Sequence, residues 1–387
     1  MHKILFFLLA GIGVLIVFGA GSFYPIWRVG DLISNYLSVE HTHVPWIVAL
    51  TATVLVMPSL FALFAVKHTN PLRKVFKWLY TIGWNVFIST VTLMFLLIVF
   101  EIVNAIAPSI STGKNALVTV IVLLALLAIV IVPQMVCAFI LTKKEIALES
   151  DKVKQPLRIA HISDVHIGSR GPKWLRKVCA QIQDEKPDML LISGDLYDLK
   201  YIPQDSLAPL NELAASLPVF YSMGNHELAT GDENVERLLA TIRNVVVLRD
   251  QGALFPHGED QIAICGVEDK NKLQELKDAA ASVVSQSSFF TDSAYRVLIH
   301  HEPFGLEEMS ESPYNFDLYV SGHTHGGQLF PLIVFIKAFF RTFIDLYVSQ
   351  NKKTALYVSP GTGTWGPTLR IAQTNRVAYL TVAPALK

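Results

Sequence analysis

Carboxylate, amide and imidazole side chains recur in five short segments of the C-terminal part of this chain. The segments are Asp164-Val-His166, Gly194-Asp195, Gly224-Asn225-His226, His301 and Gly322-His323-Thr324-His325. Such groups are the ligands that borderline divalent or trivalent cations prefer, without the softness that thiolates add. The seven candidate ligands are more than one ion needs: Asp164, His166, Asp195, Asn225, His301, His323 and His325.

This ligand set predicts a two-metal site. If Asp195 bridges, each ion receives four protein ligands and keeps open positions for water and phosphoryl oxygens. Two ions about 3.5 to 4 Å apart lower the pKa of a shared water and hold the oxygens of an in-line displacement at phosphorus. His226 has no obvious metal role, so we expect it to protonate the leaving oxygen as a general acid. Asp164 or Asp198 is its expected carboxylate partner.

Each segment directly follows a predicted strand. From residue 157 onward, short β-rich runs alternate with polar, helix-compatible segments, which is typical of an α/β domain. We expect strands at 157–162, 189–193, 219–222, 262–266, 296–300, 318–321 and 356–359, and helices at 173–184, 207–216, 233–243 and 272–284. Ligands collect at the carboxyl ends of strands in such sheets, so distant segments can meet at one point.

The N-terminal part is far more apolar. Hydrophobic residues make up 52% of the 387 residues and charged residues 17%, which is unusual for one soluble globule. Four stretches, 4–27, 46–66, 79–106 and 116–141, reach the roughly 20 residues that a membrane-crossing helix needs. We therefore expect residues 1–145 to form a transmembrane region with four helices and residues 150–387 to form the α/β domain.

Charge predicts the topology and limits the partners. Basic residues cluster in the second connection and after the fourth span, which places the domain on the cytoplasmic face by the positive-inside rule. The first span has an alternative interpretation as a signal peptide, and its removal would leave this orientation unchanged. The 32 basic and 32 acidic residues balance, so we expect no nucleic acid partner. Three scattered cysteines form no C-x-x-C pair and indicate neither a disulfide framework nor a thiolate zinc site.

The ordered motifs "ISDVHIG", "LISGDLYD", "YSMGNHE", "LIHHEP" and "SGHTHGGQ" resemble those of the calcineurin-like metallophosphoesterases, over roughly residues 157–383. The resemblance implies a four-layer αββα sandwich. It also implies one metal on Asp164, His166, Asp195 and His325, and the other on Asp195, Asn225, His301 and His323. His301 is chosen over His300 because the family's ligand precedes an x-Pro step, here Glu302-Pro303.

Four spans before such a domain look like the transmembrane proteins with a metallophosphoesterase domain. The domain is also similar to bacterial membrane-bound phosphodiesterases, which include a pyrophosphatase for acylated UDP-glucosamine. Residues 329–348 are more apolar than a surface loop, with a helical repeat that runs from Ile333 to Tyr347. They form either an interfacial helix that guides a lipid tail or a helix packed on the protein. Arg370 is a candidate for binding a non-reacting phosphate.

The leading hypothesis is hydrolysis of a phosphodiester or pyrophosphate bond in a membrane-associated substrate, such as a phospholipid or an acylated UDP-sugar. The metals are manganese, iron, zinc or nickel, and the sequence does not choose among them. One alternative is a tethered phosphodiesterase that acts on soluble nucleotides. Another is a membrane sensor or scaffold that keeps the metal cage without turnover.

Overall fold

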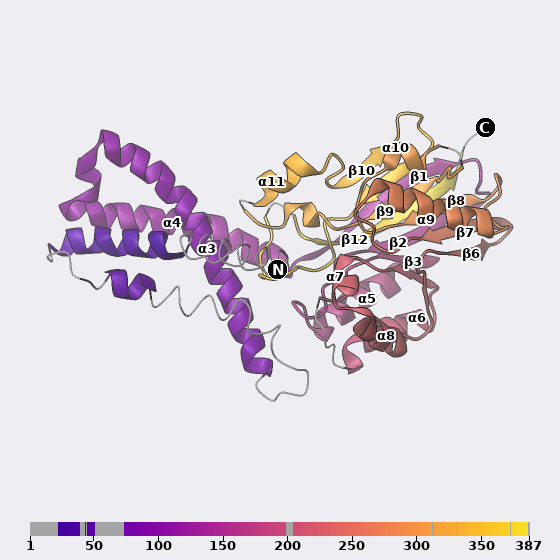
Figure 1. The fold of residues 1–387 in the computed structure, drawn as a ribbon, viewed down its shortest axis with the longest axis horizontal. Coiled ribbons are helices and arrows are strands. Elements are labelled where there is room, and N and C mark those ends of the chain that lie inside the picture. Colours follow the sequence, from indigo (N-terminus) through magenta and orange to yellow (C-terminus); the bar gives the residue numbers. More distant parts are fainter. Residues whose placement is uncertain are drawn as a thin grey trace, which may run out of the picture. The chain divides into compact units, whose positions relative to one another are not determined.

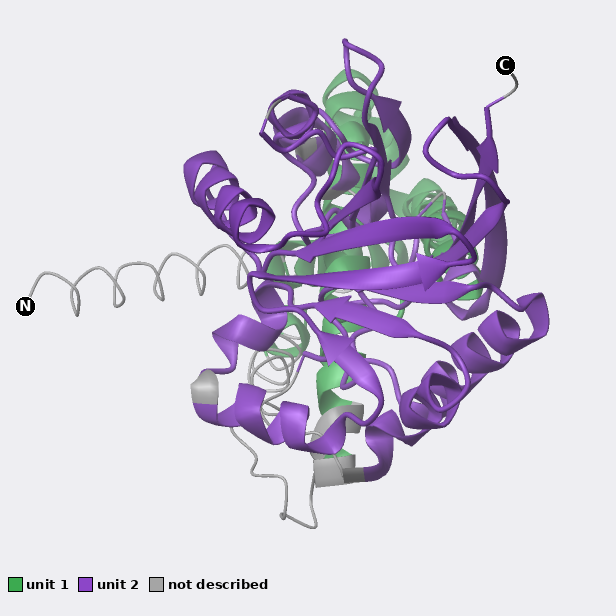
Figure 2. Cartoon of the chain, turned by 90° about the vertical axis from the view of Figure 1, so that its right-hand side faces the viewer, with its two compact units in different colours: residues 1–136, 366–369 green, residues 137–365, 370–387 purple. Residues whose placement is uncertain are grey.

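The structure, a computed structural model, describes residues 22–38, 43, 45–50, 73–198, 204–311, 313–330, 332–371 and 373–385. The chain divides into two compact units, shown in Figure 2. Residues 1–136 and 366–369 form the first unit, and residues 137–365 and 370–387 form the second. Each unit is described by itself.

The described part of the first unit is helical. It contains a helix over residues 22–37, α3 (Arg73–Ile106), the 3₁₀ turn η1 (Pro108–Ser111) and most of α4 (Gly113–Phe139). Leu79–Ile106 and Gly113–Phe139 are long and apolar enough to cross a membrane, with mean hydropathies of 2.6 and 3.1. They match two of the four predicted spans. The other two, 4–27 and 46–66, lie mostly outside the described residues.

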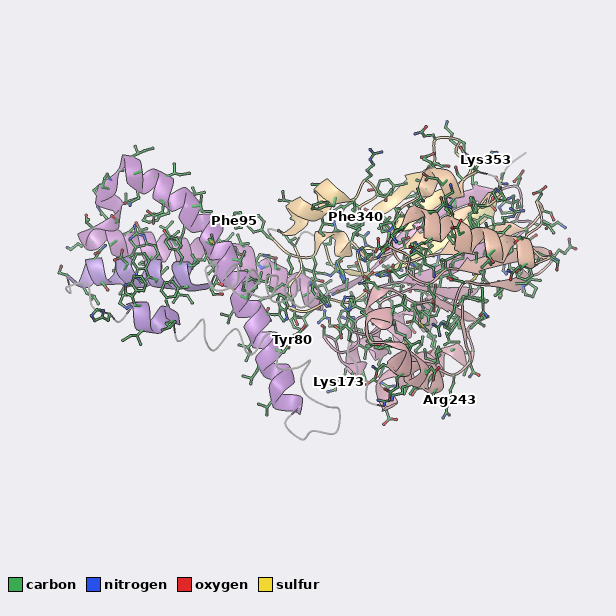
Figure 3. All side chains as sticks on the ribbon, in the orientation of Figure 1. Tyr80, Phe95, Lys173, Arg243, Phe340 and Lys353 are labelled. Carbon is green, nitrogen blue, oxygen red and sulfur yellow. The ribbon has the colours of Figure 1, made fainter. Side chains whose placement is uncertain are left out.

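Exposure in this unit fits helices that face hydrocarbon. Ile102 of α3 and Ile129 of α4 are 61% and 67% exposed, and Phe95 is marked among the outward side chains in Figure 3. Apolar exposure on this scale is unusual for a soluble protein and is expected of a surface that meets lipid. Glu101, the acidic residue inside a span, accepts a 2.6 Å hydrogen bond from Nε of Arg28. The ion pair offsets part of the cost of an acid at this position.

The second unit holds two six-stranded sheets. The first has the order β1-β12-β2-β3-β4-β5 and the second has the order β10-β11-β9-β8-β7-β6. The strands are β1 (Leu141–Ser150), β2 (Leu157–Ile162), β3 (Met189–Ser193), β4 (Val219–Ser222), β5 (Val245–Val247), β6 (Gln251–His257), β7 (Asp260–Gly266), β8 (Tyr295–Ile299), β9 (Leu318–Ser321), β10 (Asp345–Val348), β11 (Ala355–Val358) and β12 (Asn375–Pro384). β2, β3, β4 and β5 are parallel to one another, as are β7, β8, β9 and β11.

Strand alternation builds the layers. In β2, Leu157 and Ile159 enter a core that is also lined by Ile264 and Val320 of the other sheet, so the two sheets pack face to face. Ala160 and Ile162 point the opposite way, into a core shared with helices. Successive side chains of a strand alternate between faces, which makes each of these sheets buried on both sides.

Helices cover the two outer faces. The helices are η2 (Gln204–Leu207), α5 (Pro172–Glu185), α6 (Ala208–Ala214), α7 (Asn225–Ala229), α8 (Asp232–Thr241), α9 (Leu273–Gln286), α10 (Leu306–Met309), η3 (His325–Gly327) and α11 (Leu332–Phe339). The first sheet's outer core includes residues of α5, α6 and α8, which gather on one side of the strands in Figure 1. The second sheet's outer core includes residues of α9 and α10. The unit is therefore an α/β sandwich with two sheets in four layers.

All seven predicted strands are present within two residues of their predicted bounds, but β1, like β5, β6 and β10, was not predicted. This strand runs beside β12 over ten residue pairs, and a single residue, Ile140, separates it from the end of α4. Consequently the α/β unit begins at residue 137, before the predicted boundary at 150. The lysines of the segment LTKKEIALES suit an edge strand, where charge discourages pairing with other chains.

The predicted helical repeat across residues 329–348 is wrong beyond Phe339. α11 ends there, and residues 345–348 form β10, which pairs antiparallel with β11. Tyr347 packs against the core on the second sheet's outer face. Pairing with β11 satisfies the backbone of this segment and overrides the local periodicity.

Candidate metal centre

The predicted ligands follow the carboxyl ends of strands in both sheets. Asp164 and Asp195 come just after the parallel strands β2 and β3, whereas His301 follows β8 of the other sheet. Nδ1 of His301 lies 2.7 Å from the carbonyl oxygen of Ser193, the last residue of β3. The ends of the two sheets therefore meet, and this junction brings together residues that are far apart in the sequence.

Two carboxylates lie among the imidazoles. Nε2 of His325 is 3.3 Å from Oδ1 of Asp164, and Nε2 of His301 is 3.2 Å from Oδ2 of Asp195. Nε2 of His166 lies 3.9 Å from Asp164 and 3.8 Å from Asp195. Three overlapping sets of Asp and His ligand atoms fit within 4.8 Å: Asp164, His166 and His325; His166, Asp195 and His226; and Asp164, Asp195 and His301.

Asn225 and His323 complete the group. Nδ1 of His323 lies 3.3 Å from Oδ1 of Asn225, and the ring of His323 is 5.1 Å from that of His301. The backbone N–H of His323 donates to both oxygens of Asp164. All seven predicted ligands thus converge. His300 instead accepts the N–H of Lys270 at Nε2, and its Nδ1 lies 3.0 Å from the hydroxyl of Tyr319.

These residues fit metal ions better than they fit one another. Nε2 of His166 faces Nε2 of His325 at 3.0 Å, and two buried ring nitrogens of the group have no hydrogen-bond partner among the described residues. They are Nδ1 of His166 and Nδ1 of His325. A buried, unpartnered imidazole nitrogen is costly unless a cation or water accepts its lone pair. The donor set therefore suits one or more borderline cations.

The backbone of the centre is unusual. Five of the seven ligands have φ between 51° and 67°: Asp164, His166, Asp195, His323 and His325. This left-handed conformation costs a non-glycine residue about 1 kcal/mol or more and persists where the surroundings impose it. Gly322 is required here, because a Cβ would lie 2.0 Å from Oγ of Ser163 and 2.2 Å from Oδ2 of Asp164.

Burial and neighbouring charges shift the pKa values of two histidines of the group in opposite directions. Burial and the neighbouring imidazole of His325 hold the pKa of His166 well below its usual range. Burial also disfavours the charged form of His301, yet Asp195 and Asp164 raise its pKa well above normal. Metal ligation needs a neutral imidazole, so a cation bound at this site would act against the raised pKa of His301.

His226 stands at the rim of the group. Its side chain is 25% exposed, whereas those of His166 and His301 are fully buried. Nε2 of His226 lies 4.0 Å from Oδ2 of Asp195. Asp195 is therefore a nearby carboxylate in place of the expected Asp164 or Asp198. Asp198 lies 3.8 Å from Nδ1 of His166 and accepts the N–H of Ser169, which places it behind a candidate ligand.

Glu227 was missed by the sequence analysis. Its buried carboxylate accepts the backbone N–H groups of Asp195, Tyr197 and Gly224 at 2.8 to 3.1 Å. Burial and the charge of Asp195 raise the pKa of Glu227 to about 8. The signal was its place two residues after Asn225, in the first turn of α7, where an acid closes a capping box. Glu227 ties the loops after β3 and β4 together.

Arg370 is completely buried. Its Nε donates to the side chain of Asn375 at 3.0 Å, one terminal nitrogen donates to the carbonyl of Gly363 at 2.9 Å, and the other lies 3.5 Å from the carbonyl of His325. The N–H of Gly363 in turn donates to the carbonyl of Asp164 at 2.9 Å. The guanidinium therefore binds the loops that carry two candidate ligands.

A pocket of about 180 Å³ opens over this group. Its lining combines the polar residues Asp195, Asn225, His226, His323 and His325 with Thr324, Gly327, Gln328, Leu329, Ile336 and Trp365. Phe340, which Figure 3 labels, lies nearby with its ring 5.5 Å from that of His323. Candidate ligands at the floor of a pocket are open to a substrate.

Two packed sheets with candidate Asp, Asn and His ligands gathered at the ends of their strands are the arrangement that the resemblance to the metallophosphoesterases implies. Residues 157–327 match the family model described as calcineurin-like phosphoesterase. This part of the chain is therefore a calcineurin-like metallophosphoesterase domain.

Several known proteins are similar to this chain in sequence. The chain is 31% identical over 243 residues to an uncharacterized metallophosphoesterase of Helicobacter pylori, which covers 62% of this chain and 64% of that protein. It is 27% identical over 359 residues to the transmembrane protein with metallophosphoesterase domain of Danio rerio, covering 88% of this chain and 80% of the relative. It is 30% identical over 182 residues to phosphodiesterase YaeI of Escherichia coli, covering 45% and 62%.

The chain thus spans 64% of the length of the Helicobacter pylori protein, which is less than two thirds. The alignment to the Danio rerio protein is longer than the phosphoesterase domain and so includes apolar N-terminal sequence. That relative's name and the two long apolar helices together point to membrane association.

Proposed function

We propose that this protein is a membrane-anchored hydrolase of phosphodiester or pyrophosphate bonds. The observation that carries the proposal is the convergence of seven candidate metal-ligating side chains, from five loops and two sheets, four of which line one pocket. The matching family model supports it.

In this proposal two ions share the site. Asp164, His166, Asp195 and His325 hold one, and Asp195, Asn225, His301 and His323 hold the other. When bound, the ions supply charge that activates a water for attack and neutralises the phosphoryl oxygens. The carboxylate of Asp195 is suited to the bridging role, because its oxygen lies near both His166 and His301. Manganese, iron, zinc and nickel all remain candidates.

A side chain of the protein is placed to supply the proton that the leaving oxygen needs. The imidazole of His226 is more accessible than those of His166, His301 and His325 and can approach an oxygen that leaves phosphorus. The backbone N–H of His226 donates to Oδ1 of Asp195 at 3.0 Å, which fixes the loop beside the centre. We therefore assign His226 as the general acid, which delivers a proton to the leaving oxygen.

The proposed membrane arrangement has four spans with the catalytic domain on the cytoplasmic side. The two described apolar helices and the basic residues that follow the last span support it. A substrate attached to or dissolved in the membrane, such as a phospholipid or an acylated nucleotide sugar, would then meet the enzyme at its own surface.

The test uses purified full-length protein in detergent, stripped of metal with a chelator. Hydrolysis of bis(p-nitrophenyl) phosphate should be absent after stripping and should return when manganese is supplied, with two ions bound per chain by elemental analysis. Activity that survives complete removal of metal would contradict the proposed chemistry. A single bound ion in the active protein would contradict the ligand assignment.

We further propose that Arg370 positions the metal ligands and does not bind phosphate directly. Arg370→Lys keeps the charge but loses most of the fork of hydrogen bonds, so metal affinity should fall by about 10- to 100-fold, as for other residues that support ligands. Metal titrations of the chelated protein measure this change. Arg176→Lys, an exposed pair with Glu212, serves as the control. A raised KM at unchanged metal affinity would instead make Arg370 a phosphate-binding residue.

A further inference from the structure

The lining of the pocket over the metal centre includes an apolar wall. It consists of Leu329, Ile336 and Trp365. Leu329 is 4% exposed, and Ile336 belongs to α11. Of the three, Trp365 lies beside the ring of His226, from which a proton would reach the leaving oxygen.

Trp365 is held in place at this wall. The side-chain amide of Gln328 donates to the carbonyl of Trp365 at 2.9 Å, and its oxygen accepts the N–H of Trp365 at 3.1 Å. The planes of the indole and of the His226 ring are inclined by 70°, with 5.6 Å between centroids. A group attached to the leaving oxygen would therefore pass close to the indole.

The polar side chains of the wall are already engaged. Apart from the residues of the metal centre, the described lining has two polar side chains, Thr324 and Gln328. Thr324 donates to the carbonyl of Phe343 at 2.7 Å, and Gln328 bridges the backbone of Trp365. Sites that recognise a sugar or a nucleobase use placed donors and acceptors, because those groups lose hydrogen bonds to water on binding. A hydrocarbon chain makes no such demand.

We infer that this wall is a subsite for an alkyl or acyl chain carried by the leaving group, an inference that rests on the proposed function. Phe339, which follows Ile336 by one turn of α11, is 81% exposed, so a chain longer than the pocket has an apolar surface to follow. The enzyme accordingly selects a lipid-type alcohol over a nucleoside at this position.

The experiment measures inhibition of bis(p-nitrophenyl) phosphate hydrolysis by n-alkyl phosphates, from methyl to hexyl, in the manganese-loaded full-length protein. The phosphate occupies the metal centre and the chain reports on the wall. The inhibition constant should fall by up to about fourfold for each added methylene. Adenosine monophosphate, the nucleoside arm of the test, should inhibit more weakly than hexyl phosphate.

Two variants locate the effect. Ile336→Ser should shrink the ratio of the methyl to the hexyl inhibition constant at least tenfold, whereas Val334→Ser, on the same helix but outside the pocket lining, should keep the wild-type ratio. Trp365→Ser gives the same readout if the first variant is inactive. Equal inhibition at all chain lengths overturns the subsite, as does a ratio that Ile336→Ser and Trp365→Ser leave unchanged or stronger inhibition by adenosine monophosphate. Absence of metal-dependent hydrolysis in the wild type would overturn the proposed function as well.

Discussion

Asp195→Asn should abolish hydrolysis and remove bound metal. The carboxylate oxygen Oδ2 of Asp195 lies 3.2 Å from His301 and 3.8 Å from His166, so both proposed ions depend on it. An amide supplies a single neutral oxygen in place of a bridging anion. We expect turnover to fall by more than about 10³-fold, because the charge that stabilises the transition state is lost with the ions. Steady-state kinetics and elemental analysis of the same preparation measure the two effects.

The substitution is mild enough for the fold to survive. The amide oxygen of asparagine can still accept the N–H of His226, which Oδ1 of Asp195 accepts at 3.0 Å. After chelation, wild type and variant should unfold at similar temperatures, which separates metal loss from misfolding. Asp184→Asn, on the exposed side of α5, is the matched control and should change neither property. Two ions and full turnover in Asp195→Asn would refute the bridging role.

His226→Ala should lower kcat by about 10²- to 10⁴-fold for substrates with alkoxide leaving groups, the range for loss of a general acid. Its ring is at the rim, 4.0 Å from Asp195, so metal content should remain close to that of the wild type. Hydrolysis of a p-nitrophenyl ester should fall much less, because p-nitrophenolate leaves without a proton. Comparing the two substrate types in one preparation isolates proton transfer from every other defect.

The control for this prediction is His257→Ala, because His257 is a half-buried histidine of β6 whose Nε2 lies 3.1 Å from the carbonyl oxygen of Pro156. Equal loss for both leaving groups in His226→Ala would point to another role. Loss of metal would identify His226 as a ligand, which its place in one of the three Asp and His sets allows. In either case the leaving oxygen would need a different acid.

Much of the site was readable in the sequence because its signals are local. A run such as Leu157–Ile162 shows its strand by alternation and by β-branched residues, and Asp164 follows it directly. The rule that ligands gather at carboxyl ends of strands then places the group without knowledge of the sheet order. The two described apolar helices were equally plain, since length and hydropathy alone decide whether a helix can cross a membrane.

The unpredicted parts depend on partners that are distant in sequence. β1 has a charged, ambiguous pattern, and pairing with β12, more than 200 residues later, makes it a strand. The guanidinium of Arg370 is of the type that binds phosphate, so the sequence made it a candidate for that role. In the structure, the carbonyl oxygens of Gly363 and His325 lie around it. Glu227 connects the loops after β3 and β4 because the fold brings the N–H groups of Asp195 and Gly224 to its carboxylate.

By itself, the sequence of this protein determined the available chemistry: which side chains are able to bind cations, which strands precede them and which segments are apolar enough for a membrane. The tertiary structure alone decided how those groups face one another, where α11 ends, and that Leu329, Ile336 and Trp365 line the same pocket as His226. The physical reason is the distance along the sequence over which each property is determined. Side-chain chemistry and strand periodicity are local properties, whereas a pocket and a buried hydrogen-bond network exist only where separate segments have already packed together.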